Sequence, residues 1–136
     1  MALKLTLKPQ ERIILGGAVV RNAGVRPALL LIENEVAILR ERHILCEKDA
    51  NTPAKRLYFS IQLMYVDRPN ADATRPLYLA LLRDLSQEAP SMRAVLRSVS
   101  AAVEHDDYYE ALRHAWGAIQ YEKELIENAK LCPSNV

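Results

Sequence analysis

Four charged residues in a row are the clearest candidate for chemistry in this chain. They are Arg40-Glu41-Arg42-His43, and they follow a short apolar run. The forked guanidinium groups of the two arginines can bind the oxygens of a phosphate through paired hydrogen bonds. The same cluster can instead be the charged exit of a strand, where charge discourages pairing with another sheet edge. The spacing alone favours neither interpretation.

Histidines next to acidic residues give weaker indications of chemistry. His105 precedes Asp106 and Asp107 at an expected helix boundary, and Glu110 stands four residues before His114. We interpret the first group as a solvated junction with a helix cap and the second as a surface pair. The chain also lacks the glycine-rich, HExxH and GxSxG motifs that mark common enzyme families. We therefore predict no enzyme, no cofactor and no metal site.

The two cysteines and the start of the chain bear on the cellular compartment. Cys46 and Cys132 lie far apart, and neither belongs to a CxxC pair, which predicts reduced thiols. Cys132 is expected to be exposed and able to form an intermolecular disulfide in vitro. The start has no signal-peptide pattern, and no apolar run approaches the roughly 18 residues of a membrane span. These features predict a cytoplasmic protein without a membrane anchor.

Charge is distributed unevenly along the 136 residues, although the total is only +1. Residues 1–56 contain ten basic and six acidic side chains, a net charge of +4, which leaves −3 for the rest. The basic part is the one expected to meet a polyanion. An excess of this size is also compatible with an ordinary protein surface, because nucleic-acid-binding surfaces are usually more basic.

Residues 1–50 have the pattern of short strands. Residues 3–8 alternate apolar and polar side chains, which predicts a half-buried strand with Leu3, Leu5 and Leu7 inward. Gly16-Gly17 is typical of a two-residue hairpin turn. The other predicted strands are 12–15, 18–21, 28–32 and 36–40, of which 28–32 is the most apolar and is expected to be central. Together they predict a small antiparallel barrel or sandwich as the first of two modules.

Residues 51–136 have the pattern of a helical module, so the predicted class is α+β. Thr52-Pro53 is typical of a helix start, and Thr74 with Pro76 and Asp107 with Glu110 indicate two further starts. Apolar residues at helical spacing mark four buried faces. They are Leu57, Ile61, Met64 and Tyr65; Leu77, Tyr78, Leu81, Leu82 and Leu85; Met92, Val95, Leu96, Val99 and Val103; and Leu112, Ala115, Trp116, Ile119, Leu125 and Ile126.

The aromatic residues all fall in this helical module, and the chain has none before Tyr58. They could be stacking platforms for bases, but most lie on or beside the apolar faces. We therefore interpret most of them as packing residues. Tyr108 and Tyr109 are adjacent and cannot both face one core. If the basic strands bind RNA, they do so through cations and backbone groups.

Several stretches resemble the FlbT family of bacterial flagellum-biosynthesis regulators. They are Met1-Ala2-Leu3-Lys4-Leu5-Thr6-Leu7-Lys8-Pro9, Leu39-Arg40-Glu41-Arg42 with Ile44-Leu45, Thr52-Pro53-Ala54-Lys55-Arg56-Leu57-Tyr58-Phe59, and Gln62-Leu63-Met64-Tyr65. The similarity extends from residue 1 to about residue 130. It implies association with the 5′ untranslated region of flagellin mRNA and promotion of its decay. Some relatives are activators, so the resemblance leaves the sign of regulation open.

The strands alone resemble CsrA, a small β-rich translational repressor. Such proteins exchange strands in a dimer and bind RNA with their first and last strands. The matching positions here are Lys4, Thr6, Leu39 and Arg40. The resemblance implies a homodimer, and the helices have no counterpart in CsrA.

The favoured function is post-transcriptional regulation of flagellin expression, with repression as the expected sign. The alternative is an adaptor that binds a flagellar protein or a co-regulator through its helices without touching RNA. The residues predicted to bind RNA are Lys4, Thr6, Lys8, Leu39, Arg40 and Arg42.

Overall fold

The computed structural model describes residues 2–131, and it divides into two compact units. The β module contains residues 2–44 and 66–68, and the helical module contains residues 45–65 and 69–131. Because strands and helices are segregated along the chain, the predicted α+β class is confirmed. Cys46 is an exposed free thiol, whereas Cys132 lies outside the described residues.

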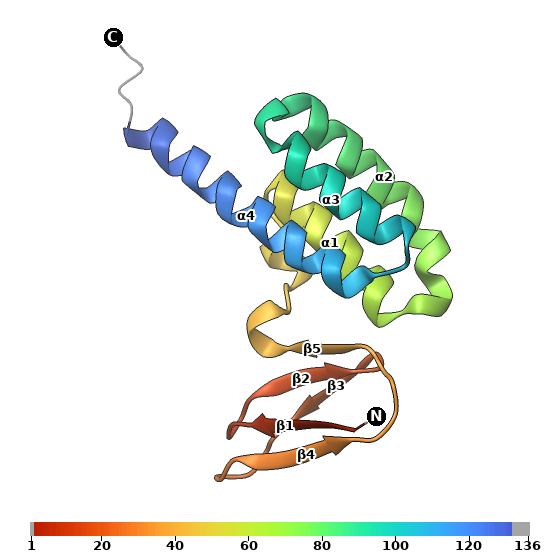
Figure 1. Ribbon diagram of the computed structural model, residues 1–136. Coiled ribbons are helices and arrows are strands. Elements are labelled where there is room, and N and C mark those ends of the chain that lie inside the picture. The colour runs from red at the N-terminus through yellow and green to blue at the C-terminus, as the bar shows by residue number, and fades with distance from the viewer. Residues whose placement is uncertain (1, 132–136) are drawn as a thin grey trace. The chain divides into compact units, whose positions relative to one another are not determined.

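The β module contains five short strands in two antiparallel sheets. The strands are β1 (Leu3–Leu7), β2 (Arg12–Leu15), β3 (Ala18–Arg21), β4 (Ala28–Ile32) and β5 (Ile38–Arg40). β1 pairs with β4, and the second sheet has the order β3-β2-β5 (Figure 1). Within the described residues the strands close no barrel, so the barrel prediction is not confirmed. β1 pairs with β4 and β5 pairs with β2 within one chain. These pairs therefore form without strand exchange with a second copy.

The hairpin between β2 and β3 follows the prediction made from its two glycines. Gly16 and Gly17 have φ angles of +57° and +92°, values that residues with a side chain rarely adopt. This two-residue connection fixes the register, so that Leu15 faces Ala18 and Arg12 faces Arg21. Two arginines therefore lie directly opposite each other on neighbouring strands.

The strand expected to be central, β4, lies at a sheet edge instead. It pairs only with β1, and the side chains of Leu29 and Leu31 are 69% and 52% exposed. A run of five apolar residues hides the alternation of buried and exposed positions, which is why the sequence suggested burial on both faces. β5 is also shorter than predicted, since it begins at Ile38 rather than at residue 36.

The apolar centre of the β module is small. Leu7, Ile13, Ile14 and Leu39 are its buried apolar residues, contributed by β1, β2 and β5. Leu3 is largely exposed and Leu5 is only partly covered. The inward face predicted for β1 is thus buried only at its carboxyl end.

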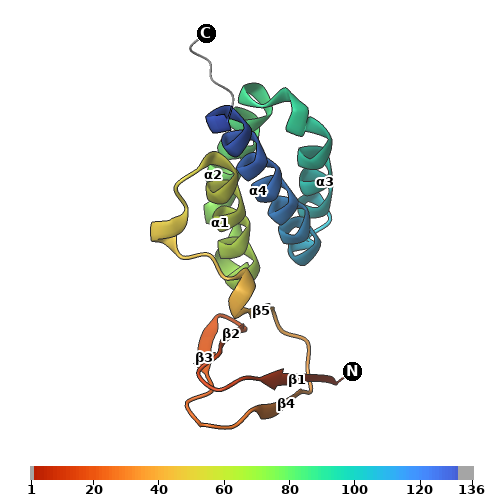
Figure 2. The same cartoon turned by 90° about the vertical axis from the view of Figure 1, so that its left-hand side faces the viewer.

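The helical module consists of four α-helices joined by short connections (Figures 1 and 2). They are α1 (Pro53–Val66), α2 (Ala71–Glu88), α3 (Arg93–Glu104) and α4 (Tyr108–Leu131). The predicted start of α1 is confirmed, because the hydroxyl oxygen of Thr52 accepts a hydrogen bond from the amide of Lys55 at 3.3 Å. The apolar face predicted for α1 is buried throughout.

The second helix differs from its prediction at both its start and its buried face. α2 begins at Ala71, so Pro76 lies inside the helix instead of opening it. The φ angle of proline suits a helix, but inside one it removes a backbone hydrogen bond and its ring crowds the carbonyl four residues earlier. Tyr78 and Leu85 are buried seven residues apart, whereas Leu77 is 53% exposed. The buried face of the helix therefore includes Tyr78 and Leu85 but not Leu77.

Only one of the two hydrogen bonds of the predicted capping box forms at the start of α4. The carboxylate of Asp107 accepts a hydrogen bond from the amide of Glu110 at 3.2 Å. The amide of Asp107 donates to the carbonyl of Ala102 instead of to Glu110. The Glu110 carboxylate is therefore available for Arg113 and His114, at 3.1 Å and 3.5 Å. The predicted surface pair of Glu110 and His114 is confirmed.

Most tyrosines are packing residues, as predicted. Tyr58, Tyr65, Tyr78 and Tyr108 are buried, while Tyr109 is 48% exposed. The adjacent pair at the start of α4 therefore faces in two directions, as its spacing requires.

Three residues of the apolar face predicted for α4 are not buried. Trp116, Leu125 and Ile126 are 37%, 39% and 42% exposed. Residues 123–129 are all exposed, and α4 continues past the other helices in Figure 1. Trp116 is partly covered by Tyr58, whose ring it meets edge-on.

The buried side chain of Gln62 binds the backbone of the segment that precedes α1. Gln62 on α1 is 5% exposed, and its side chain both donates to the carbonyl and accepts from the amide of Leu45, each at 2.9 Å. These two bonds hold the segment before α1 against that helix. The helical module accordingly starts at Leu45 in the structure, whereas the sequence placed the boundary between residues 50 and 51.

Replacing Gln62 by leucine should lower the free energy of unfolding by about 2–4 kcal/mol, because both Leu45 backbone groups lose their partner. The same substitution at Gln87, which is exposed on α2, should change stability by less than about 0.5 kcal/mol. Urea denaturation of the two variants measures the difference. Equal stability of both variants would show that the Leu45 segment does not depend on Gln62.

Candidate nucleic-acid interface

One face of the β1–β4 sheet carries two of the residues predicted to bind RNA. Lys4 lies opposite Leu31 and Thr6 lies opposite Leu29, so all four side chains share one face. All four are exposed. This surface, named the β1–β4 face, therefore combines a cation, a hydroxyl and two apolar side chains. The two leucines were not predicted as part of the site.

Lys8 follows β1 in a turn that fixes its backbone. Its amide donates to the carboxylate of Glu11 at 2.8 Å, and its carbonyl accepts from the Glu11 amide at 3.0 Å. The side chain of Lys8 is exposed. Lys8 lies one residue past β1, so its side chain adds a cation at the carboxyl end of the row formed by Lys4 and Thr6. Glu11 brings one negative charge close to this row.

Asn22 positions the end of β1 through several hydrogen bonds. Its side-chain amide donates to the carbonyls of Leu7 and Arg26, at 3.0 Å and 2.9 Å. Its side-chain oxygen accepts from the amide of Gly24 at 3.0 Å. The loop between β3 and β4 is thus fixed to the strand that carries Lys4 and Thr6.

Arg40 connects the two sheets of the β module. It belongs to β5, yet its terminal guanidinium nitrogen donates to the carbonyl of Thr6 on β1 at 2.7 Å. A charged donor makes this a strong hydrogen bond. Arg40 is therefore partly a structural residue, and replacing it removes a link between the two sheets as well as a surface charge.

The rest of the charged cluster lies in a 3-10 turn, Glu41–His43. Glu41 accepts hydrogen bonds from the amide and the side chain of Arg12, at 3.1 Å and 3.3 Å, so it neutralises Arg12. Arg42 is exposed. Burial, together with the charge of Arg42, lowers the pKa of His43, which therefore adds little positive charge at neutral pH. Arg42 is the member of the cluster best placed to meet a phosphate.

The side chain of Leu39 is buried and does not reach the surface. Its side chain is 2% exposed and lies opposite Ile14 in the β2–β5 pair. The sequence position suggested an RNA contact, but the pleat points this side chain into the small core of the β module. We therefore remove it from the candidate interface.

One further cation could have been found from the sequence. Arg21 is exposed and lies opposite Arg12, a register that the Gly16-Gly17 turn determines. Two like charges on paired strands destabilise the pair unless a counter-ion is present. Glu41 supplies that counter-ion to Arg12 only, which leaves Arg21 as an additional cation of the β module.

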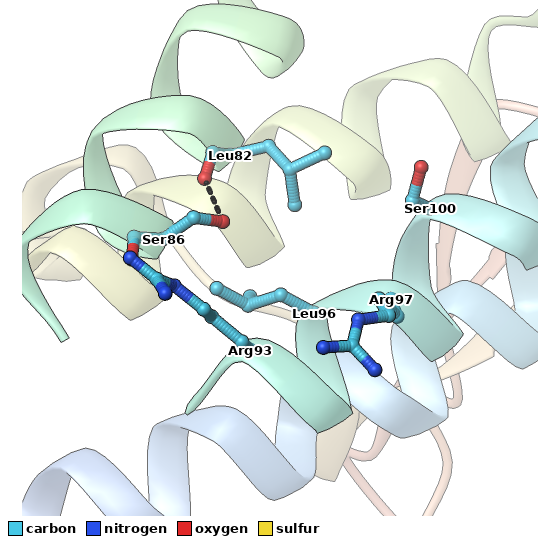
Figure 3. Close-up of a pocket in the computed structure, with 6 residues that line it drawn as sticks. All are labelled: Leu82, Ser86, Arg93, Leu96, Arg97 and Ser100. Carbon is cyan, nitrogen blue, oxygen red and sulfur yellow. Dashed lines mark hydrogen bonds between the residues drawn. The ribbon is translucent and has the colours of Figure 1, made fainter. Parts of the chain in front are cut away.

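The helical module offers one pocket with two arginines, between α2 and α3 (Figure 3). Its volume is about 280 Å³, and it is lined by Leu82, Ser86, Arg93, Leu96, Arg97 and Ser100. Arg93 donates to the carbonyl of Ser86 at 3.1 Å, which caps the end of α2. In Figure 3 the side chain of Leu96 lies between the two guanidinium groups, so they do not converge on one anion.

Two further findings concern metal ions and membranes. Across residues 2–131, no three His, Cys, Asp or Glu side chains lie close enough to hold a metal ion. None of the helices in that range is long and apolar enough to cross a membrane.

Comparison with known proteins places the chain among flagellar regulators. The family model described as "Flagellar protein FlbT" matches residues 3–126. The chain is 42% identical to the "Probable flagellum biosynthesis repressor protein FlbT 1" of Bradyrhizobium diazoefficiens, over 92% of this chain and 85% of that protein. It is 34% identical to the "Flagellum biosynthesis repressor protein FlbT" of Caulobacter vibrioides, over 93% and 90%. No solved structure matches the chain.

Proposed function

This chain belongs to the FlbT family of flagellar proteins, and we propose that it regulates flagellin expression after transcription by binding the leader of flagellin mRNA. Its regulatory role in flagellum biosynthesis follows from relatives named as repressors of that process. The direct contact with the 5′ untranslated region and the promotion of mRNA decay are our proposals. Repression is the proposed sign, and the cytoplasm is the proposed site of action.

The β1–β4 face is the observation that carries this proposal. Lys4 and Lys8 provide mobile cations for phosphates, and Thr6 provides a hydroxyl. Leu29 and Leu31 offer apolar area against which unstacked bases can lie. The exposed guanidinium group of Arg42 adds a further cation to the β module. The proposed action is to occupy the leader and so change access by ribosomes and nucleases.

The alternative is an adaptor that binds a flagellar protein or a co-regulator. Its support is the exposed apolar surface of the helical module, including Tyr109 and Trp116. Aromatic residues of this kind often dominate protein–protein interfaces. In that case the β module would touch RNA only through the partner.

Direct binding by the purified full chain separates the two functions. Fluorescence anisotropy with a labelled flagellin leader should give an affinity that falls as salt rises, and a length-matched coding-region RNA should bind more weakly. If the leader binds no better than that control at any salt concentration, the adaptor is the better account.

The predicted homodimer stays a prediction. If strand edges were the interface, four strands of the β module lie at a sheet edge: β1, β3, β4 and β5.

A further inference from the structure

A groove on the helical module has an apolar floor and charged walls. Its volume is about 440 Å³, and it lies along α4 beside the start of α1. The residues that line it and carry the argument are Leu45, Lys55, Trp116, Ile119, Lys123 and Ile126. We name this surface the α4 groove.

Trp116 gives the groove a rigid apolar wall. Its ring meets Tyr58 edge-on, with ring centres 5.8 Å apart and planes inclined at 63°. The side chain is nevertheless 37% exposed. A tryptophan that is held in place and still accessible is typical of the anchors of protein interfaces, because little conformational entropy is lost when it is covered.

The charges that the groove presents are mainly positive. Lys55 and Lys123 line it on opposite helices, together with Glu127. The other acidic residue in the wall, Glu122, is 8% exposed, and its carboxylate accepts a hydrogen bond from the amide of Ala54 at 2.9 Å. Glu122 therefore caps the start of α1 and contributes little to what a ligand meets.

The groove is self-complementary along α4. Trp116 and Lys123 line it, and so do Ile126 and Glu127 further along the helix, with Ile126 42% exposed. An apolar residue and a charged residue therefore stand at each end of the same side of α4. Because all four lie on one helix, a two-fold axis across α4 places Ile126 and Glu127 of each copy against Trp116 and Lys123 of the other.

We propose that a second copy of this chain occupies the α4 groove, through an antiparallel pairing of the two α4 helices. Such an interface is isologous, and it would cover Trp116 and Ile126 of both copies at once. It accounts for the partial exposure of these two side chains on one side of α4. It requires no change in the strand pairs of the β module and does not depend on RNA binding.

Trp116 is the single tryptophan of the chain, so its emission reports directly on the groove. Sedimentation velocity of the full chain should show a monomer–dimer equilibrium at micromolar concentrations. Over the same range the Trp116 emission should shift to the blue and become protected from acrylamide. Ile126→Glu should raise the dissociation constant by at least about tenfold and remove the protection.

Leu79→Glu is the matched control, because Leu79 is 51% exposed on α2 outside the groove. It should leave both readouts unchanged, and circular dichroism verifies that both variants are folded. A monomer at all concentrations with unchanged emission would overturn the proposal. A dimer that is insensitive to Ile126→Glu and leaves Trp116 open to acrylamide would also overturn it, and would point to another surface such as the strand edges. A protected Trp116 in a monomer would indicate an intramolecular cover and would equally contradict a second copy.

Discussion

Replacing Lys4, Lys8 and Arg42 together by alanine is expected to weaken binding to the flagellin leader by roughly 10² to 10³-fold at 50 mM salt. Each single-strand phosphate contact contributes about −0.7 to the slope of log affinity against log salt, so three lost contacts flatten it by about 2. The side chains of all three residues are exposed, so the fold should be retained. A salt titration by anisotropy measures both quantities.

The control is a second triple variant with the same change in net charge. Lys48, Arg56 and Arg97 are exposed cations of the helical module, and replacing them by alanine should leave the salt slope nearly unchanged. If both triple variants lose affinity equally, general charge rather than the β module attracts the RNA. If neither loses affinity, the cations of the β1–β4 face and Arg42 are not the contact.

Replacing Leu57 by alanine should lower the free energy of unfolding by about 2–5 kcal/mol, because its side chain is fully buried in the helical module. Leu77 also lies on an expected apolar face, but it is 53% exposed, so Leu77→Ala should cost less than about 1 kcal/mol. Chemical denaturation of both variants tests which leucines form the core.

The same pair of variants tests which face of α2 is buried. If Leu77→Ala lowers the free energy of unfolding as much as Leu57→Ala does, Leu77 is buried, as the leucine spacing predicted. That result would contradict the burial of Tyr78 in its place.

Local signals in the sequence predicted much of the fold correctly. Gly16-Gly17 specified the hairpin because a two-residue turn with positive φ angles leaves one register. Thr52-Pro53 specified the start of α1 because a side-chain cap and a proline both suit the first turn. The buried face of α1 followed from helical spacing alone.

Features that depend on distant contacts were not predictable in this way. The sequence of β4 is apolar at every position, so only its pairing with β1 reveals which side chains are exposed. The buried position of Leu39 depends on its place opposite Ile14. The early start of the helical module depends on Gln62, a side chain seventeen residues further along the chain. In each case the deciding partner is remote in sequence.

In the candidate interface, too, some residues could be predicted from the local sequence and others only from distant contacts. Lys4, Thr6 and Lys8 follow from alternation along one strand, and the structure leaves all three exposed. The role of Arg40 as a link between sheets could not be predicted, because the carbonyl of Thr6 lies on a strand of the other sheet. Leu29 and Leu31 join the face only through the register of β1 and β4.

Photo-crosslinking of the full chain to 4-thiouridine-labelled flagellin leader, followed by mass spectrometry, tests the central claim most directly. If the β module contacts the leader itself, cross-linked peptides should come from residues 2–11 and 26–32, which contain Lys4, Lys8 and the two exposed leucines of β4. An excess of unlabelled leader should compete for these cross-links, and an excess of coding-region RNA should not. Cross-links confined to residues 52–131, or equal competition by both RNAs, would contradict the account.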